Sequence, residues 1–191
     1  EGKGKIIDLL AESSDFVVRY SGGNNAGHTV INHLGEFWLH VVPAGIFNEN
    51  TQCVIGNGVA LDPNILISEL DQLEKANIDV SRLIISDRAH IVFPFHRLLD
   101  SLEESRLQDK AIGTTKRGIG PTFVDKTARR GVRMGDLLHR DNFREKVTEI
   151  VEYVNVLLEK VYGHEGVDIQ ELFDLGDKWG SRLNHSITHI L

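Results

Sequence analysis

The chain has 191 residues, of which 41% are hydrophobic and 26% are charged, and its formal net charge at pH 7 is −7. This composition is typical of a globular protein with one hydrophobic core, and the acidic balance excludes a generally basic nucleic-acid binder. No apolar stretch is long enough to span a bilayer, and the single cysteine, Cys53, fits a reducing, cytoplasmic compartment. We therefore expect neither a membrane nor a nucleic acid as a partner.

The chain opens on a glycine- and lysine-rich turn, EGKGK at 1–5, ahead of an amphipathic helix predicted over residues 3–11. A glycine-rich turn that opens a helix and carries lysines is typical of the second half of a phosphate-binding loop. With the strand predicted over 16–20, it forms most of a βαβ unit whose first strand would precede Glu1. This start, and an end at Leu191 inside an element, lead us to expect a fragment of a longer protein.

The loop SGGNNAGHT at 21–29 is the strongest candidate for chemistry. Its glycines let the backbone approach a ligand closely, Asn24 and Asn25 offer paired amide donors and acceptors, and His28 can move a proton near neutral pH. The alternative is a turn whose histidine only caps or packs. A β-hairpin over 29–32 and 36–40 should follow, with His40 as a structural residue on a strand face.

Strands and helices then alternate. We predict a short strand at 52–55 that ends in Gly-Asn-Gly, a helix beginning at Pro63, a strand at 82–86 and a helix beginning at Pro94. His90 and His96 are interpreted as hydrogen-bonded supporting residues, although His90 lies near a strand end where ligands bind in such folds.

A basic segment follows between residues 113 and 133, with six Lys and Arg side chains and a single Asp. Glycines, threonine hydroxyls and cations in one loop suit a phosphate. Nucleic acid is a rival ligand, but the aromatic residues that stack on single strands are missing. A short helix over 122–130 and longer helices over 141–161 and 168–182 complete the chain. The sequence therefore predicts an α/β fold with a largely parallel central sheet and flanking helices, followed by a helical segment.

Five motifs stand in a fixed order along the chain: EGKGK at 1–5, GGNNAGHT at 22–29, GNGV at 56–59, SDRAH at 86–90 and GTTKRGIGP at 113–121. In identity, order and spacing they resemble the adenylosuccinate synthetase family, and the resemblance covers essentially all 191 residues. It implies a P-loop-NTPase-like fold. The chain would be the N-terminal part of a single domain, with a nucleotide- and IMP-binding part at 1–133 and a mainly helical part at 134–191.

The resemblance also implies an activity. The family joins IMP and L-aspartate with GTP and Mg²⁺, giving adenylosuccinate, GDP and phosphate through a 6-phosphoryl-IMP intermediate. It implies a homodimer, because an arginine matching Arg129 reaches the IMP of the neighbouring subunit. Arg130 is adjacent, and an exchange of roles between these two arginines stays open.

The resemblance assigns roles residue by residue. His28 matches the general acid, Lys3 the phosphate-loop lysine, and Gly27 a carbonyl ligand of Mg²⁺. The general base is an aspartate that would directly precede Glu1, and the guanine- and aspartate-recognising segments would lie beyond Leu191. The residues implied to bind GTP are Glu1, Gly2, Lys3, Gly4, Lys5, Gly27, His28 and Thr29. Those implied to bind IMP are Glu1, Gly2, Lys3, Asn25, Ala26, Gly27, His28, Thr115 and Arg129.

Two other interpretations stay open at this point. One is a nucleotide- or phosphate-binding module without chemistry, in which the glycine loops and the basic segment bind phosphate only. The other is a different phosphoryl-transfer enzyme, for which a longer Gly-x-x-x-x spacing before the Gly-Lys pair would be expected.

Overall fold

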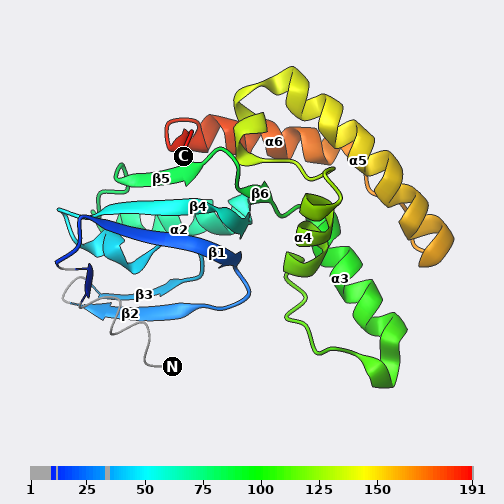
Figure 1. Ribbon diagram of the computed structural model, residues 1–191, viewed down its shortest axis with the longest axis horizontal. Coiled ribbons are helices and arrows are strands. Elements are labelled where there is room, and N and C mark those ends of the chain that lie inside the picture. The colour runs from blue at the N-terminus through cyan, green and yellow to red at the C-terminus, as the bar shows by residue number, and fades with distance from the viewer. Residues whose placement is uncertain (1–9, 12, 33–34, 191) are drawn as a thin grey trace.

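The computed structural model describes residues 10–11, 13–32 and 35–190. Its centre is a sheet in which β1 (Phe16–Gly23), β4 (Gln52–Leu61), β5 (Leu83–Ser86) and β7 (Ile187–Thr188) lie side by side in that order, and the two-residue strand β6 (His90–Ile91) also pairs with β4 (Figure 1). Every pair in this sheet is parallel. The predicted parallel α/β fold is confirmed. The predicted helix over 3–11 lies outside the described residues except for its end, where Leu10 and Ala11 are helical.

The strands β1 and β4 are longer than the sequence predicts. β4 does not end at Gly56-Asn57-Gly58 but continues through it, and β1 continues through Ser21-Gly22-Gly23. A side chain at position 58 would collide with the carbonyl oxygen of Tyr20 on β1, and the register shifts at the same place. The glycines therefore permit a bulged close approach of two backbones instead of breaking the strand. This shortens the candidate loop to 24–27.

The predicted hairpin is confirmed as a separate two-stranded antiparallel sheet of β2 (His28–Asn32) and β3 (Gly35–Leu39). His28 is the first residue of β2 and stands opposite Leu39. His40 follows the end of β3, so the prediction that it lies on a strand face is wrong in position.

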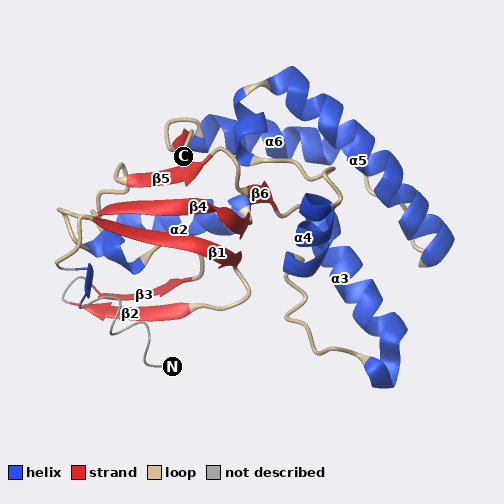
Figure 2. Ribbon diagram, in the orientation of Figure 1, coloured by secondary structure: helices blue, strands red, loops and turns tan. Residues whose placement is uncertain are grey.

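Helices flank the central sheet (Figure 2). α2 (Pro63–Lys75) begins where predicted, because the Asp62 carboxylate accepts hydrogen bonds from the first free N–H groups, at 3.0 Å from Asn64 and 3.2 Å from Ile65. The other helices are α3 (Pro94–Leu107), α4 (Ile119–Thr127), α5 (Arg140–Val161) and α6 (Ile169–Leu183). Short 3₁₀ turns occupy Ala44–Phe47, Gln108–Lys110 and Met134–Leu138. Helix α4 begins three residues earlier than predicted, since proline is tolerated in a first helical turn.

One contiguous hydrophobic core joins the sheet to the helices. Trp179 on α6 is fully buried, packs with its ring tilted against that of Phe93 and donates its indole N–H to Asn64 at 2.9 Å. Gly176 sits under the ring of Phe143 on α5, where any side chain would collide with the ring. This close helix packing explains why a glycine occupies the interior of α6. Within the described part of the chain, no helix combines the length and apolar character that crossing a membrane requires.

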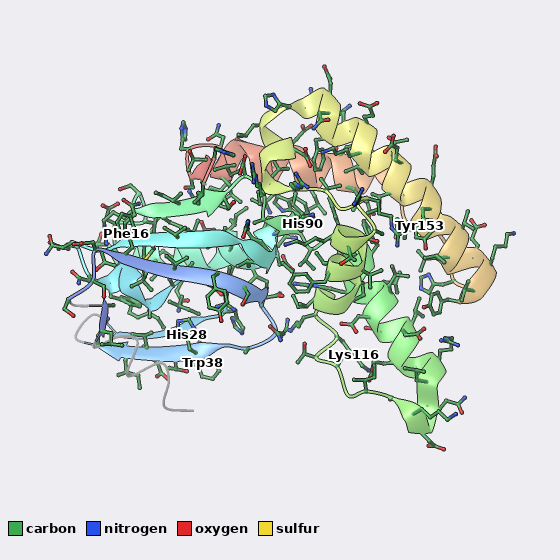
Figure 3. The ribbon with its side chains drawn as sticks, in the orientation of Figure 1. Phe16, His28, Trp38, His90, Lys116 and Tyr153 are labelled. Atoms are coloured by element: carbon green, nitrogen blue, oxygen red, sulfur yellow. The ribbon has the colours of Figure 1, made fainter. Side chains whose placement is uncertain are left out.

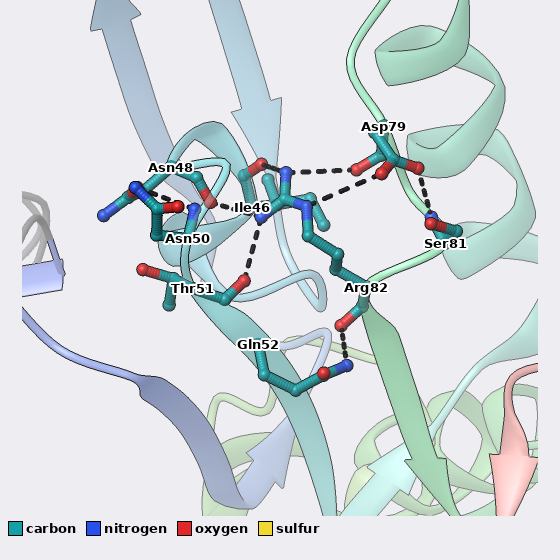
Figure 4. A network of polar contacts seen from close by, with 8 residues as sticks. All are labelled: Ile46, Asn48, Asn50, Thr51, Gln52, Asp79, Ser81 and Arg82. Atoms are coloured by element: carbon teal, nitrogen blue, oxygen red, sulfur yellow. Dashed lines mark hydrogen bonds and ion pairs between the residues drawn. The ribbon is translucent and has the colours of Figure 1, made fainter.

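Arg82 fastens the amino-terminal end of the sheet (Figure 4). Its guanidinium donates to the carbonyl oxygens of Ile46 and Thr51, both at 2.8 Å, and to that of Asn48. It also pairs with the Asp79 carboxylate at 3.7 Å. These contacts tie the turn before β4 to the start of β5, at the end of the sheet away from the candidate loop.

Candidate functional site

The candidate loop leaves the sheet at the carboxyl ends of three parallel strands. Gly23 at the end of β1 pairs with Ala60 on β4, and Ala60 in turn pairs with His90 on β6. Residues 24–27 then cross to the hairpin, where His28 begins β2. Ligands in open α/β sheets bind at this edge, so the chain places its glycine- and amide-rich loop where the fold favours a site.

His28 is half-buried, and its Nε2 atom is buried with no hydrogen-bond partner among the described residues. Burial lowers the pKa of His28 below its ordinary value, and the charges of Arg19 and His40 lower it further. The imidazole is therefore neutral near pH 7 before a ligand arrives. An anion beside Nε2 would favour the protonated ring and raise its pKa.

A pocket of about 610 Å³ opens beside this histidine. Ala26, Gly27 and His28 form one wall, and β1 contributes Arg19 and Tyr20 to another. The predicted phosphate-loop residues, from Glu1 to Lys5, lie outside the described residues. Leu10 and Ala11, which are helical, line the same pocket. The pocket therefore adjoins both the histidine loop and the helical residues Leu10 and Ala11.

The basic loop before α4 is held by two buried carboxylates of α3. Glu104 accepts hydrogen bonds from the backbone N–H groups of residues 112–114, at 2.9–3.3 Å. Asp100 accepts from the Thr114 hydroxyl at 2.8 Å and from the Gly118 N–H at 2.9 Å. These backbone donors are therefore occupied inside the protein. The exposed side chains of Thr115, Lys116 and Arg117 are what the loop presents outward.

Arg129 and Arg130 differ sharply in their surroundings. Arg130 pairs with the buried Asp125 at 2.6 Å and lies over the ring of Tyr153 at 4.0 Å. Arg129 is exposed and has a left-handed backbone with φ of 64°, and its side chain makes no hydrogen bond or ion pair with other described residues. This contrast favours Arg129 as the arginine that is free to reach a ligand.

Helix α4 brings the basic segment to the histidine loop. The side chain of Ile119, at the start of α4, fills the space over Gly23 where a Cβ would stand. Lys126 on the same helix donates to the Asn57 carbonyl of β4 at 3.0 Å. Figure 3 shows Lys116 on the loop before α4 and His28 at the hairpin. Thr115 and Arg129 thus flank a helix that abuts the end of β1, without touching His28.

The two histidines that the sequence predicts to be supporting residues, His96 and His90, have different surroundings. His96 is a hydrogen-bonded supporting residue, as predicted: its Nδ1 accepts from the Phe93 N–H at 2.9 Å and its Nε2 lies 3.0 Å from the Asp125 carboxylate. His90 is buried, and burial, with the charges of Lys126 and Arg133, lowers its pKa to about 4. Its Nδ1 has no partner among the described residues. A ligand contact by His90 therefore stays a prediction.

Sequence reasoning named Asn24 only as one of a pair with Asn25, and it missed two other residues near the loop, Arg19 and Glu69. The amide of Asn24 is buried, and neither its oxygen nor its nitrogen has a partner in the described part of the chain, whereas Asn25 is exposed. Arg19 on β1 is partly buried and donates to the Gly23 carbonyl. Glu69 lies on the apolar face of α2, and a carboxylate among the leucines of an amphipathic helix is a signal that the sequence did offer.

Among the described residues no cluster of three or more His, Cys, Asp or Glu side chains could hold a metal ion. Mg²⁺ often takes only one or two protein ligands and completes its octahedron with water and phosphate oxygens. Gly27 is exposed in the loop beside His28, so its carbonyl is a hard oxygen that fits this coordination.

The parallel sheet, the phosphate-loop sequence and the glycine-rich loop at the carboxyl edge place the chain in the class of P-loop-like α/β folds. The model of one family, adenylosuccinate synthetase, matches residues 1–191. The chain belongs to the adenylosuccinate synthetase family.

Individual relatives agree. The chain is 50% identical over 194 residues to the adenylosuccinate synthetase of Dehalococcoides mccartyi, covering 100% of this chain and 46% of the relative. It is 52% identical over 188 residues to that of Heliobacterium modesticaldum, covering 98% of this chain and 44% of the relative. The chain thus spans less than half the length of these curated relatives.

Solved structures show the same fold. The fully ligated adenylosuccinate synthetase of Plasmodium falciparum matches with a TM-score of 0.85 and 34% identity, over 98% of this chain and 43% of that one. The cyanophage S-2L succinoaminodeoxyadenylate synthetase, bound to dGMP and dATP, matches with a TM-score of 0.55 and 20% identity, over 80% of this chain and 44% of that one. The second likeness concerns the fold alone.

Proposed function

We propose that the protein carrying this chain is an adenylosuccinate synthetase, which uses GTP to join IMP and L-aspartate into adenylosuccinate, GDP and phosphate. The observation that carries this proposal is His28, a neutral histidine at the wall of a pocket of about 610 Å³ whose buried Nε2 has no hydrogen-bond partner among the described residues. Family membership supports this reaction, and the position of His28 supports its proposed role as the proton donor.

The first step activates the purine. The 6-oxygen of IMP attacks the γ-phosphorus of GTP, so that an O6–P bond forms and the bond to the GDP oxygen breaks, while the N1 proton leaves the base. Negative charge then accumulates on GDP. His28 next to that oxygen gains a proton as the phosphate raises its pKa, and its N–H stabilises the leaving group. A positioned proton donor contributes about 10²–10⁴-fold in rate.

The second step joins aspartate. The amine of L-aspartate attacks C6 of the phosphorylated base, the C6–O bond breaks, and inorganic phosphate leaves with the oxygen that IMP carried. The general base for the first step would be the aspartate expected directly before Glu1. The aspartate- and guanine-recognising segments would follow Leu191, in the part of the family's length that this chain does not span.

Substrate contacts are proposed for three loops, the phosphate loop, the histidine loop and the basic loop. Lys3, with the backbone from Glu1 to Lys5, would hold the GTP phosphates. Asn25, Ala26 and Thr115 would contact IMP, and Gly27 and Thr29 would flank His28 beside GTP. The Gly27 carbonyl would hold Mg²⁺, which when bound neutralises charge on the phosphates. Lone Gly-Lys turns and threonine loops are common, so these assignments depend on the set of residues taken together.

A homodimer completes the proposal. Arg129 is exposed and unpaired among the described residues, so its guanidinium can reach an IMP phosphate on a second copy of the chain. A cytoplasmic location fits the free, buried Cys53.

The test uses the full-length protein, in which this chain is continued to the length of its relatives. Adenylosuccinate formation should require IMP, GTP and aspartate together, and titration calorimetry should detect IMP binding. His28→Ala should lower kcat about 10²–10⁴-fold. Tight binding of an oligonucleotide without IMP binding would favour a nucleic-acid-binding module instead. GTP hydrolysis without adenylosuccinate would favour a different phosphoryl-transfer enzyme.

A further inference from the structure

A buried carboxylate on α2 binds the backbone of residues 40–42, the segment that follows β3 and contacts the candidate loop at 24–27. Glu69 is 4% exposed and lies on the face of α2 that carries Leu66, Leu70 and Leu73. Its Oε1 accepts a hydrogen bond from the His40 N–H at 2.6 Å, and its Oε2 accepts from the N–H groups of Val41 at 3.1 Å and Val42 at 3.0 Å. Burying a charge is costly unless it is hydrogen-bonded, and three backbone donors offset that cost here.

The His40 ring connects this carboxylate to the loop. Its Nδ1 lies 3.3 Å from Oε1 of Glu69. Its other edge lies against Gly27, where an added Cβ would stand 3.1 Å from both Cδ2 and Nε2 of the ring. The imidazole therefore fills the space between α2 and the residue directly before His28.

The hairpin holds the opposite side of the same loop. His28 pairs with Leu39, so the residue that begins β2 stands opposite the residue that precedes His40. On β1, Arg19 donates to the carbonyl of Gly23, where the loop begins. The loop from Asn24 to Gly27 is thus fixed at its two ends, and the His40 ring is the contact that supports its last residue.

We propose that Glu69 and His40 are positioning residues for this loop. Glu69 orients the His40 imidazole, and the imidazole supports Gly27, so that the Gly27 carbonyl and the His28 side chain keep one geometry relative to α2. Neither residue touches substrate. This inference rests on the proposed function for its effect on rate, and on the contacts alone for its effect on the loop.

The rival explanation is that Glu69 only stabilises the turn at 40–42. A purely structural role would lower the melting temperature of Glu69 and His40 variants without changing kcat or the mobility of the loop. Positioning predicts a loss in kcat, because a misplacement of about 1 Å in a catalytic group costs up to about 10²-fold in rate.

The experiment compares His40→Ala, His40→Phe and Glu69→Gln in the full-length protein. Glu74→Gln is the matched control. Glu74 is a carboxylate on the same helix, α2, and it pairs with Arg182 at the surface, away from the loop. We expect His40→Ala and Glu69→Gln to lower kcat about 10-fold or more. His40→Phe keeps a ring against Gly27 and should keep kcat within about 3-fold of the wild type.

A second measurement does not depend on catalysis. Amide hydrogen exchange over residues 24–29 should be faster in His40→Ala than in Glu74→Gln, and close to wild type in His40→Phe. The inference is overturned if His40→Ala leaves both kcat and this exchange at the values of the control. If the wild type forms no adenylosuccinate, the proposed function fails, and the exchange measurement still decides whether His40 supports the loop.

Discussion

The Nε atom of Arg130 lies 2.6 Å from Oδ1 of Asp125, a buried carboxylate that also contacts His96 at 3.0 Å. Burial alone would raise the pKa of Asp125, but the hydrogen bonds from His96 and Arg130 outweigh it, and the pKa stays below its ordinary value. Arg130 is therefore committed to the interior of the fold. Its neighbour Arg129 is exposed and has no such partner among the described residues.

Because Arg130 is paired inside the fold and Arg129 is exposed, substituting the two arginines should have different effects. Arg129→Ala should raise the KM for IMP about 10–100-fold, because a hydrogen bond to a charged group contributes about 1.5–3 kcal/mol, and should leave the melting temperature unchanged. Arg130→Ala should lower the free energy of unfolding by about 1–3 kcal/mol, because it leaves Asp125 with one fewer partner. Steady-state kinetics and thermal unfolding of both variants check this. The reverse pattern would exchange their roles.

Acid should destabilise the protein through His90. Its folded pKa is about 4, because burial disfavours the charged ring, whereas an unfolded histidine has a pKa near 6.5. Between these values the unfolded chain binds more protons than the folded one, so this contribution to stability is complete above about pH 6.5 and is lost as the pH falls toward 4. The loss should reach up to about 3 kcal/mol.

Denaturant unfolding between pH 4 and pH 7 measures this effect. His90→Gln should flatten the pH dependence, whereas His185→Gln, which changes an exposed histidine, should not. An unchanged slope in His90→Gln would show that other groups cause the acid sensitivity.

Gly118 and Gly120 offer a matched pair at the start of α4, where Gly118 precedes the helix and Gly120 lies in its first turn. Gly118 has φ of 76°, and a Cβ there would stand 2.8–2.9 Å from atoms of His96 and Arg97, so Gly118→Ala should lower the free energy of unfolding by about 2 kcal/mol or more. At Gly120 nothing lies within 4 Å of an added Cβ, and alanine in this helical turn should be neutral or stabilising. Thermal unfolding of the two variants should diverge. Equal losses would contradict the loop geometry.

Arg82 should matter for stability and not for catalysis. Arg82→Ala removes the donor from three carbonyls at the amino-terminal end of the sheet and should cost about 2–4 kcal/mol, while kcat and KM stay near wild type. Arg106→Ala is the control, because its pair with Glu103 is exposed to solvent and should contribute little to stability. A large change in KM for Arg82→Ala would refute the assignment of this network to the scaffold.

The sequence predicted what local patterns encode. The apolar spacing of α5 and the Asp62-Pro63 start of α2 gave the correct elements, because helical periodicity and capping are properties of neighbouring residues. The glycines at 56 and 58 predict a strand end, but β4 continues through them. The local sequence does not show this, because the role of these glycines depends on the backbone of β1 across the sheet. Arg129 and Arg130 are identical in a sequence, and only the buried carboxylate beside one of them distinguishes the pair.

The same limit applies to the site. His28 stood out because its loop has a recognisable composition, whereas Glu69 and His40 are 29 residues apart and meet only in the folded chain. The sequence-derived roles of Lys3 and the other residues at 1–5 stay predictions, because these residues lie outside the described ones.

Isotope transfer tests the central claim most directly. IMP labelled with ¹⁸O at the 6-position would be incubated with the full-length protein, GTP and L-aspartate, and the inorganic phosphate analysed by mass spectrometry. Phosphorylation of the purine oxygen predicts that each adenylosuccinate formed is accompanied by one phosphate carrying the label, and that His28→Ala slows the appearance of both products together. Unlabelled phosphate, or labelled phosphate released at the wild-type rate by His28→Ala, would contradict it.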